Sequence, residues 1–600
     1  MSRRVLLSAM FCLVLGVLLV FPVSSLEFGV ANSEARSVGQ SDGLRVHNLN
    51  TTRSYSTIQE AINAVETLGG HVISVDSGVY RERVSVNKSL SIVGQDRSST
   101  IIDGFGGTVV HVTSNDTEIR DLTVRNGTFG ILVERSEDVR LVGNVVSEGS
   151  YGIRIYHSKN VQVVGNRVSG FRFFGIELDS SGNSFLRNNQ MMSNRYNFGV
   201  DGNSLTDFLN DIDESNTVNG KAVRYLINQR GLVVDSSGFE DVGFIGLVNS
   251  TRITVEELDV RNNKQGLLFA FVTDSSIVGV NAVDNWNGVY VAHSKNVSVS
   301  WVTANYNFDY GIKFFNSSRS VAISNNVDSN GWGGIGLFKS SGSLLDKNEA
   351  NFNSYNLHIV FTNNSVITRN NASGLSPEKP GSYSIAVYYS HNSRIFHNAF
   401  STTLLFVESR NGSRIVPKNK WDNGVEGNYW LYYGGRDSNL DGIGDTVYRV
   451  GENNTDSFPL KGRFWDFIVL LGGRLHSLTL ISNSSAARLD WNATGTRISL
   501  AVSGRNGTLG FSRVALPKGF VQSIELGSLN FVIDGLKPTL VRNWSDSVYY
   551  YWYFSYIHSA APLPETSDSW LIYAFGVSAL LLSAGLVIFI ALRKRRARLK

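Results

Sequence analysis

The feature that most constrains this chain is a short phrase in which a glycine stands between an aromatic or small residue and an aliphatic one. The copies are Tyr151-Gly152-Ile153, Phe174-Gly175-Ile176, Phe198-Gly199-Val200, Asn287-Gly288-Val289, Tyr310-Gly311-Ile312 and Gly333-Gly334-Ile335. They return about every 22 to 24 residues, a period typical of proteins built from stacked coils. The interval from Gly199 to Gly266 accommodates about three further periods.

Within each repeat, short segments alternate apolar and polar residues and show no helical stripe. A period of two indicates β-strands. Coils made of such strands stack so that each coil buries the apolar face of its neighbour. The sequence therefore predicts an all-β chain: a right-handed parallel β-helix, followed by a small β-sandwich and one C-terminal transmembrane helix.

The two ends predict where the chain resides. Arg3-Arg4 and the apolar run Val5–Val20 have the pattern of a secretory signal peptide, which contains the only cysteine, Cys12. Trp570–Leu592 is long and apolar enough to span a bilayer, and the basic run that begins at Arg593 follows it. By the positive-inside rule, we expect a single-pass protein of the cell membrane with a large ectodomain outside and a short cytoplasmic tail.

Changes of pattern divide the chain into predicted segments. They are a signal peptide (1–25), a flexible N-terminal segment (26–53), the β-helix with an N-terminal cap (54–415), a closing motif (416–463), a β-sandwich stalk (464–559), a linker (560–569), the transmembrane helix (570–592) and a basic tail (593–600). The strands expected in the stalk are Arg497–Val502, Gly507–Phe511, Phe531–Gly535 and Tyr550–Ile557.

The composition excludes some partners. The net charge of +4 is small for 600 residues, so the sequence gives no indication of nucleic-acid binding. About fifteen Asn-x-Ser/Thr sequons fit an exported and glycosylated surface, although asparagine, serine and threonine are also common in β-coil turns.

Three stretches resemble the NosD-type β-helix proteins and their archaeal surface relatives. Thr57–Val65 predicts a short amphipathic helix that covers the open end of the coils. Asp213–Gln229 interrupts the repeat as the insertion of that family does, and a closing motif begins at Trp421 and continues to Asp456-Ser457-Phe458-Pro459-Leu460. The resemblance covers roughly residues 55–461. It implies a β-helix of the class associated with carbohydrate binding and sugar hydrolysis, and it does not by itself imply copper.

A copper site within this chain is not favoured by its residues. Soft-metal sites use Cys, Met and His, and the chain beyond the leader offers only Met191 and Met192 besides histidines. His157 and His293 occupy the same turn of their repeats, and the stacking distance of coils places them too far apart to share an ion.

A calcium loop is the second metal candidate. Asp437, Asn439, Asp441 and Asp445 match positions 1, 3, 5 and 9 of the calcium-loop pattern, with Gly442 at position 6. The usual glutamate at position 12 is replaced by tyrosine. The alternative is a set of Asx-turns without metal.

Aligning the repeats on their glycines suggests a polar face. Two residues after the glycine lie Arg154, Glu177 and Asp201, and four residues after it lie Tyr156 and Asp179. Carboxylates on one sheet face with an arginine and a tyrosine beside them suit glycoside hydrolysis, or the proton transfer of a lyase or epimerase. The alternative is a structural salt-bridge ladder, with Arg154 opposite Glu177.

Two sets of aromatic residues accompany the repeats. Those before the glycines (Phe129, Tyr151, Phe174, Phe198 and Tyr310) are predicted by strand parity to point into the core. Trp286, Trp301, Tyr306 and Trp332 lie near coil turns, where they are candidates to stack on a sugar ring.

Three functions remain open from the sequence. The first is binding of a polysaccharide or envelope glycan at the cell surface, with envelope proteins as further partners. The second is an enzyme acting on polysaccharide through Glu177, Asp179 and Asp201. The third, implied only by the resemblance, is an accessory role in copper-enzyme maturation.

Overall fold

A computed structural model describes residues 45–239, 241–379, 381–406, 408–410, 413–471, 474–491, 497–521 and 529–558. The predicted signal peptide, the linker, the segment Trp570–Leu592 and the basic tail lie outside the described residues. Within the described ranges, no helix is long and apolar enough to cross a membrane.

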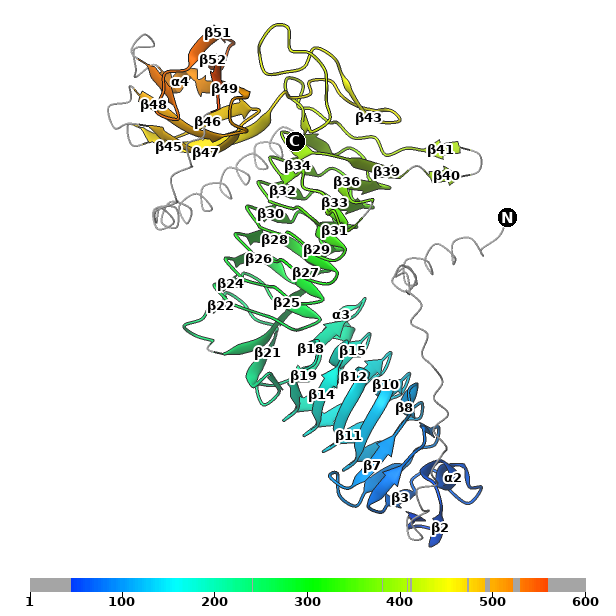
Figure 1. Cartoon of the computed structure of the whole chain (residues 1–600). Coiled ribbons are helices and arrows are strands. Elements are labelled where there is room, and N and C mark those ends of the chain that lie inside the picture. The colour runs from blue at the N-terminus through cyan, green and yellow to red at the C-terminus, as the bar shows by residue number, and fades with distance from the viewer. Residues whose placement is uncertain are drawn as a thin grey trace, which may run out of the picture. The chain divides into compact units, whose positions relative to one another are not determined.

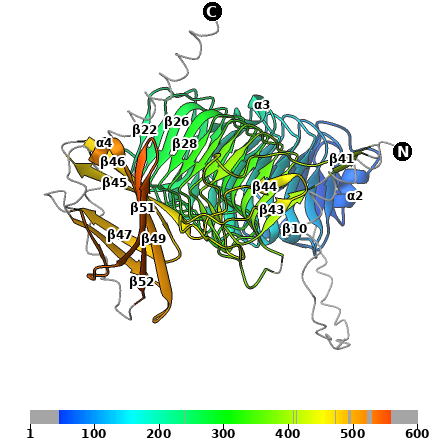
Figure 2. The ribbon, with the colours of Figure 1, turned by 90° about the horizontal axis from the view of Figure 1, so that it is seen from above.

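The described residues up to about 460 form a parallel β-solenoid of the right-handed type, with about 15 turns and very little helix (Figure 1). The predicted β-helix is therefore confirmed. Figure 2 shows the coils one behind another. A long sheet follows the stack through β4 (Gly78–Tyr80), β5 (Val84–Val86), β7 (Thr100–Asp103), β8 (Thr108–Val112), β10 (Thr123–Glu134), β12 (Val145–Tyr156), β14 (Arg167–Phe171), β15 (Phe174–Asp179), β17 (Gln190–Met192), β18 (Tyr196–Asp201), β20 (Thr217–Val218), β21 (Lys221–Ile227), β23 (Val242–Val248), β25 (Gln265–Ala270), β27 (Asn287–Ala292), β29 (Tyr310–Phe315), β31 (Gly333–Phe338), β33 (Tyr355–Val360), β36 (Tyr383–Tyr388) and β39 (Thr403–Phe406).

Two further sheets complete the coils. A nine-stranded sheet contains β1 (Val46–Asn48), β2 (Arg53–Tyr55), β3 (Val72–Val75), β6 (Ser91–Gly94), β9 (Glu118–Arg120), β11 (Arg140–Val142), β13 (Gln162–Val164), β16 (Phe185–Arg187) and β19 (Asp211–Ile212). An eight-stranded sheet takes over after the interruption, through β22 (Val233–Val234), β24 (Thr254–Glu256), β26 (Thr273–Val278), β28 (Lys295–Ser300), β30 (Val321–Ile323), β32 (Leu344–Asp346), β34 (Val366–Thr368) and β37 (Arg394–Phe396).

Buried asparagines connect the coils at their turns. Asn325 donates its side-chain amide to Asn348 Oδ1 at 2.8 Å, and Asn348 donates to Asn370 Oδ1 at 2.8 Å. Asn370 continues to Asn398, and Asn398 to Asn428. We call such a column an asparagine ladder; another contains Asn144, Asn166, Asn189 and Asn216. Each side-chain amide satisfies backbone groups that the turn would otherwise bury without partners.

The N-terminal end of the solenoid contains the predicted helix. α2 (Ile58–Asn63) packs on β1, β3 and β5, buries Ile58 and Ile62, and begins at Thr57, whose side chain accepts from the Glu60 amide. The predicted apolar stripe continued to Val65, which is wrong, because the helix ends at Asn63 and Val65 is exposed.

The closing motif ends one asparagine ladder at the other end. Asn428 donates its backbone amide to Asp456 Oδ2 at 2.7 Å, and the Trp430 indole donates to the same oxygen at 2.8 Å. Burial raises the pKa of Asp456 to about 6 against the lowering effect of these donors. The strands here are β35 (Asn371–Ala372), β38 (Ala399–Phe400), β40 (Glu408–Arg410), β41 (Ser413–Ile415), β42 (Tyr429–Trp430), β43 (Tyr448–Gly451) and β44 (Asn454–Asp456).

The coil stack is interrupted after β18. α3 (Leu205–Phe208) follows, and β20 pairs antiparallel with β21 before parallel pairing resumes at β23. The coil that contains Lys264 then lies beside β18, since the backbone amide of Lys264 donates to the Phe198 carbonyl at 2.9 Å. β21 and β23 account for the repeats predicted between Gly199 and Gly266.

Residues 463–557 form two further sheets. The five-stranded sheet contains β45 (Arg463–Leu471), β46 (Arg474–Ser482), β49 (Leu509–Pro517), β52 (Tyr549–Ile557) and β51 (Thr539–Ser545), and the three-stranded sheet contains β47 (Ser485–Trp491), β48 (Arg497–Ser503) and β50 (Asn530–Ile533). One apolar cluster includes Leu478, Leu500, Leu516, Ile533 and Trp552, so it draws on both sheets. A short helix, α4 (Lys518–Val521), follows β49.

We expect the asparagine ladders to be a main source of stability. Asn348→Ala removes the side chain that bonds the Ala322 carbonyl and both the backbone and the side-chain nitrogen of Asn325. Because these buried groups then lack a partner, we expect the free energy of unfolding to fall by about 3 kcal/mol. Chemical denaturation measures the loss. The matched change at the exposed Asn203 is expected to leave the free energy of unfolding within about 0.5 kcal/mol of wild type. Equal effects of the two substitutions would contradict the role of the ladder.

Candidate functional site

The polar face predicted from the repeats is a compact ion-pair cluster. Arg154 Nε lies 3.1 Å from Glu177 Oε2, and Arg154 Nη2 lies 2.8 Å from Asp179 Oδ2. Lys264 Nζ lies 2.6 Å from Glu177 Oε1 and 3.2 Å from Asp201 Oδ2. Glu177 is only 3% exposed and Lys264 only 8%. Two cations thus hold three carboxylates in one network, which is buried at Glu177 and Lys264 and partly exposed at Arg154, Asp179 and Asp201.

Lys264 was not found by the sequence analysis. It is 87 residues from Glu177 and reaches it because the coil that contains Lys264 returns beside β18 after the interruption. Gly199 makes room for it, since a Cβ at that position would lie 2.3 Å from the Lys264 Cβ. The one available signal was a lysine two positions before a repeat glycine, where the next repeats carry Trp286, Asp309 and Trp332.

The electrostatics of the cluster favour a structural role. Burial acts to lower the pKa of Lys264, but Glu177, Asp201 and Asp179 outweigh it, so the pKa lies above its usual value. The pKa of Arg154 is also raised by Glu177 and Asp179 against the lowering effect of burial. Both cations therefore stay charged. A carboxylate such as Glu177, buried between them, has no open path to a substrate and is poorly placed as an acid or nucleophile.

The strand register corrects one part of the predicted face. The glycine alignment placed Asp201 beside Glu177, but Glu177 pairs with Gly199 and Asp179 pairs with Asp201. The pairing of Arg154 with Glu177 and of Tyr156 with Asp179 is as predicted. The alignment was wrong by two residues because Phe198 pairs with Ile176, and Tyr196 holds the place opposite Phe174.

The aromatic residues before the glycines do not all point into the core. Phe198 is buried there, in an edge-to-face contact with Phe244. Phe129 and Tyr151 are half-buried and stack on each other at 4.7 Å. Tyr310 is buried, but its ring does not lie in the core. It lies over Gly333 and Gly336 and contacts Lys313 and His358. Lys313 and His358 occupy strand positions that alternate with those of the core residues.

The four aromatic residues proposed for sugar stacking, three tryptophans and one tyrosine, differ in their exposure. Trp286 is half-buried and packs against Phe174, Tyr196 and Phe308. Trp301 and Trp332 are 43% and 41% exposed, and Tyr306 is 68% exposed. None of the four lines either pocket of the first coils, which lie between Arg81 and Arg172.

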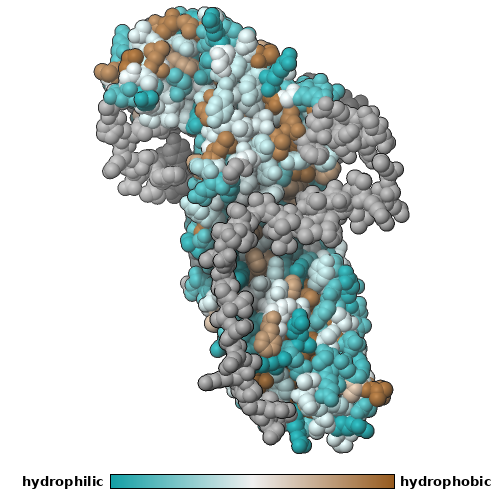
Figure 3. All heavy atoms as spheres, turned by 45° about the vertical axis from the view of Figure 1, so that its right-hand side comes forward, coloured by the Kyte–Doolittle hydropathy of each residue, from teal (hydrophilic) through white to brown (hydrophobic). Residues whose placement is uncertain are grey.

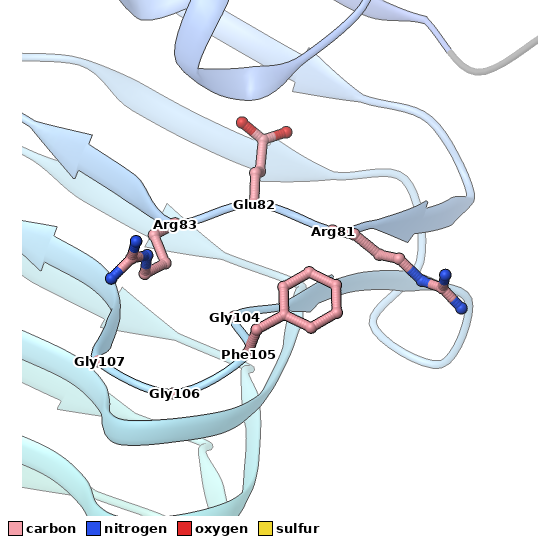
Figure 4. Close-up of a pocket in the computed structure, with 7 residues that line it drawn as sticks. All are labelled: Arg81, Glu82, Arg83, Gly104, Phe105, Gly106 and Gly107. Atoms are coloured by element: carbon pink, nitrogen blue, oxygen red, sulfur yellow. The ribbon is translucent and has the colours of Figure 1, made fainter. Parts of the chain in front are cut away.

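A hollow opens on the first coils of the solenoid, next to α2. Figure 4 shows the Phe105 ring between the side chains of Arg81 and Arg83, with Glu82 pointing away from it. A pocket of about 470 Å³ here adjoins one of about 730 Å³ that reaches Arg172, and Phe105 lines both. We call the two together the Phe105 hollow. Its lining is Arg81, Glu82, Arg83, Asp103, Gly104, Phe105, Gly106, Gly107, Asn126, Gly127, Thr128, Glu148, Gly149, Ser150, Gly170 and Arg172.

The Phe105 hollow was also missed by the sequence analysis. The available signal was an aromatic residue inside a glycine run, Gly104-Phe105-Gly106-Gly107, with Arg81 and Arg83 about one repeat earlier. Phe105 is 68% exposed and has a φ of 49°. A bulky residue in this left-handed region is unusual. The face of the molecule in Figure 3 is largely hydrophilic, with separate apolar patches.

The candidate calcium loop is occupied by its own hydrogen bonds. Asp437 accepts the amides of Asp441 and Gly442, and Asp445 accepts the amide and hydroxyl of Ser438. Asn439 donates to Asp441 Oδ2 at 2.9 Å. This is the geometry of Asx-turns.

The residues considered for a copper site have other neighbours in the structure. Over the described residues no group of three or more His, Cys, Asp or Glu side chains is placed to hold a metal ion. Met191 is buried, and His293 stacks on Phe271 at 4.8 Å. The serines beside the repeat histidines explain this turn: Ser158 and Ser294 each donate a backbone amide to the hydroxyl of the serine one coil further on.

A second buried polar group lies further along the long sheet. Tyr310 Oη is 2.6 Å from His358 Nδ1, and Lys313 Nζ is 3.0 Å from Asp309 Oδ2. Burial, helped by Lys313, lowers the pKa of His358 to about 3. His358 is therefore neutral at physiological pH and too weak a base for proton abstraction.

A model of the family described as periplasmic copper-binding protein (NosD) matches residues 62–223 and 214–435, which is more than half of the chain. The chain belongs to the NosD family. A cell surface glycoprotein of Methanothermus fervidus is 31% identical over 108 residues, and the match covers 18% of this chain and 18% of that relative.

Solved structures with similar coils have low similarity to this NosD-family chain. A PL6 alginate lyase complexed with a trisaccharide has a TM-score of 0.25 at 10% identity and covers 58% of this chain and 86% of its own. The A-module of the Azotobacter vinelandii mannuronan C-5 epimerase AlgE4 has a TM-score of 0.23 at 13% identity, with 63% and 93% covered. Similarities this low carry no information about activity.

We expect Lys264 to be coupled energetically to Glu177. Lys264→Met leaves a buried carboxylate short of its partner, which destabilises a protein by about 3 to 5 kcal/mol. In a Glu177→Gln background the same change is expected to have less than half this effect, because the charge is gone. Denaturation of the four proteins measures the coupling, with Lys159→Met as an exposed control. Equal losses in both backgrounds would contradict the coupling.

His358 is expected to make stability depend on pH. Its pKa is about 3 in the folded chain and 6.5 ordinarily, so the unfolded chain binds the extra proton as pH falls below 6.5. The contribution of neutral His358 to the free energy of unfolding is therefore fully present above pH 6.5 and is lost as the pH falls towards 3. Between pH 8 and 4.5 the wild type is expected to lose about 3 kcal/mol more than His358→Gln. Parallel curves for the two proteins would contradict this.

Proposed function

We propose that this NosD-family protein is displayed at the cell surface and binds a polysaccharide or envelope glycan without turning it over. The observation that carries the proposal is the Phe105 hollow, where an exposed aromatic ring lies among polar side chains on rigid coils. Sugar-binding sites need this combination, because a ring face packs against the sugar while polar groups bind its hydroxyls.

Binding is favoured over catalysis by the state of the carboxylate cluster. Glu177, Asp179 and Asp201 were the residues available for hydrolysis or proton transfer. Their ion pairs with Arg154 and Lys264 leave no free acid and base flanking an open space. Hydrolytic sites require two carboxyl groups on either side of a bound sugar.

Surface display is supported by two facts outside the hollow. The sequence predicts a signal peptide and an anchor at Trp570–Leu592, and the matched relative is named a cell surface glycoprotein. We place the solenoid outside the cell on this basis. Protease treatment of intact cells tests it, because only an outward chain is cleaved.

The binding function is tested by screening the full-length chain on a glycan array, with and without calcium, and by assaying the retained glycans for products. We expect retention of at least one glycan class, no product, and a loss of affinity of about tenfold or more in Phe105→Ala. Trp332→Ala removes an exposed aromatic outside the hollow and is expected to retain the glycan. Thermal unfolding first confirms that each variant is folded.

Two results would overturn the proposal. Product formation that disappears in a folded Glu177→Gln variant would make the protein an enzyme. Retention that is lost in Trp332→Ala and kept in Phe105→Ala would move the glycan site away from the hollow.

A further inference from the structure

Three arginines of the Phe105 hollow form no ion pair within the described part of the chain. Arg81, Arg83 and Arg172 are exposed, and no carboxylate in the described part of the chain lies within ion-pair distance of them. Elsewhere on the coils, arginines such as Arg154 and Arg187 each contact two carboxylates. The hollow therefore concentrates positive charge that the fold does not use.

The nearest carboxylate, Asp103, is already paired. Its Oδ2 lies 3.0 Å from Arg125 Nε, and its Oδ1 accepts the Asn126 amide at 3.0 Å. Burial acts to raise the pKa of Asp103, but these two hydrogen bonds and the charges of Arg125 and Arg81 outweigh it and hold the pKa below its usual value. Asp103 stays ionised and paired with Arg125. The charge of Arg81 also acts on Asp103, but Arg81 forms no ion pair with it, so the Arg81 guanidinium keeps its hydrogen-bond donors for a ligand.

The second carboxylate, Glu82, is turned away from the hollow. Its two oxygens accept the backbone amides of Ile58 and Gln59 at 2.9 Å each. Figure 4 shows it on the opposite side of the chain from the Phe105 ring. Glu148, on the far rim, is the remaining acidic side chain of the lining. Three arginines thus face one free carboxylate.

The floor of the hollow lets a ligand approach the backbone. Gly106 and Gly107 have φ values of 85° and 67°, in the region that favours glycine. The Arg83 guanidinium lies over Gly107, where a Cβ would be 2.8 Å from Nη1. Ser150 and Thr128 add hydroxyls beyond the ring.

We propose that the Phe105 hollow binds a carboxylated sugar chain, such as one containing uronic acid residues. This inference rests on the proposed glycan-binding function and adds the class of glycan. The guanidinium groups of Arg81, Arg83 and Arg172 pair with sugar carboxylates, for which arginine has matching planar geometry. The exposed face of Phe105 packs against a sugar ring between them.

The test compares two ligands with the same sugar backbone: hexagalacturonate, whose carboxyl groups are ionised, and its methyl ester, in which a methyl group removes each charge. Calorimetric titration of the full-length chain is expected to give an affinity at least about tenfold higher for the acid form. Raising the salt concentration is expected to reduce this difference, because exposed charges are screened.

Variants separate the charge from the ring. Arg81→Ala is expected to weaken the acid form by about tenfold and to leave the ester unchanged. Phe105→Ala is expected to weaken both forms. Arg140→Ala is the matched control, because Arg140 is an exposed arginine on β11, in a different sheet of the same coils, and it should change neither affinity.

Each other result has a defined meaning. Equal binding of both forms, lost in Phe105→Ala, would overturn the selection for carboxylates and leave glycan binding in place. Stronger binding of a phosphorylated dextran than of hexagalacturonate would overturn it in favour of phosphate. Failure to bind either form, by a chain that retains a neutral glycan on the array, refutes only this inference, whereas silence in both experiments refutes the proposed function as well.

Discussion

The buried asparagine ladder is the interaction on which the structure depends. A coil must turn tightly, and each turn buries backbone groups that water cannot reach. The side chain of Asn348 satisfies such groups and joins its own coil to those of Asn325 and Asn370. Because every amide needs a partner on the adjacent coil, a single coil is not a stable unit, and the stack needs closed ends. Asp456 and α2 provide them.

The same constraint fixes the register and hence the outer face. Once the ladders align the coils, outward side chains at equivalent positions stack about 5 Å apart, so Arg154 meets Glu177 and Asp179 meets Asp201. The stack tolerates one interruption, and Lys264 enters there. It neutralises carboxylates that would otherwise repel one another, so the face that seemed suited to catalysis holds the coils together across the interruption.

The Phe105 hollow differs from that cluster in its electrostatics. At the cluster every charge has a partner, whereas around Phe105 the carboxylates of Asp103 and Glu82 bind other groups and three arginines form no ion pair. Internal pairing stabilises the fold, and unpaired charge beside an exposed ring creates affinity for an external anion. The two sites lie on the same solenoid but contribute respectively to its stability and to the proposed recognition of a glycan.

The sequence by itself determined the solenoid. The glycine phrase, the alternation of period two and the turn asparagines are local signals that recur, so the coils, the closing motif at Trp421–Leu460 and the pairing of Arg154 with Glu177 were all predictable. Only the tertiary structure decided where Lys264 lies, which residue stacks on Asp179, and that Arg81, Phe105 and Arg172 share one hollow. These depend on how a long excursion returns and on which carboxylates other residues have already taken. Such information arises from packing between distant segments and has no period in the chain.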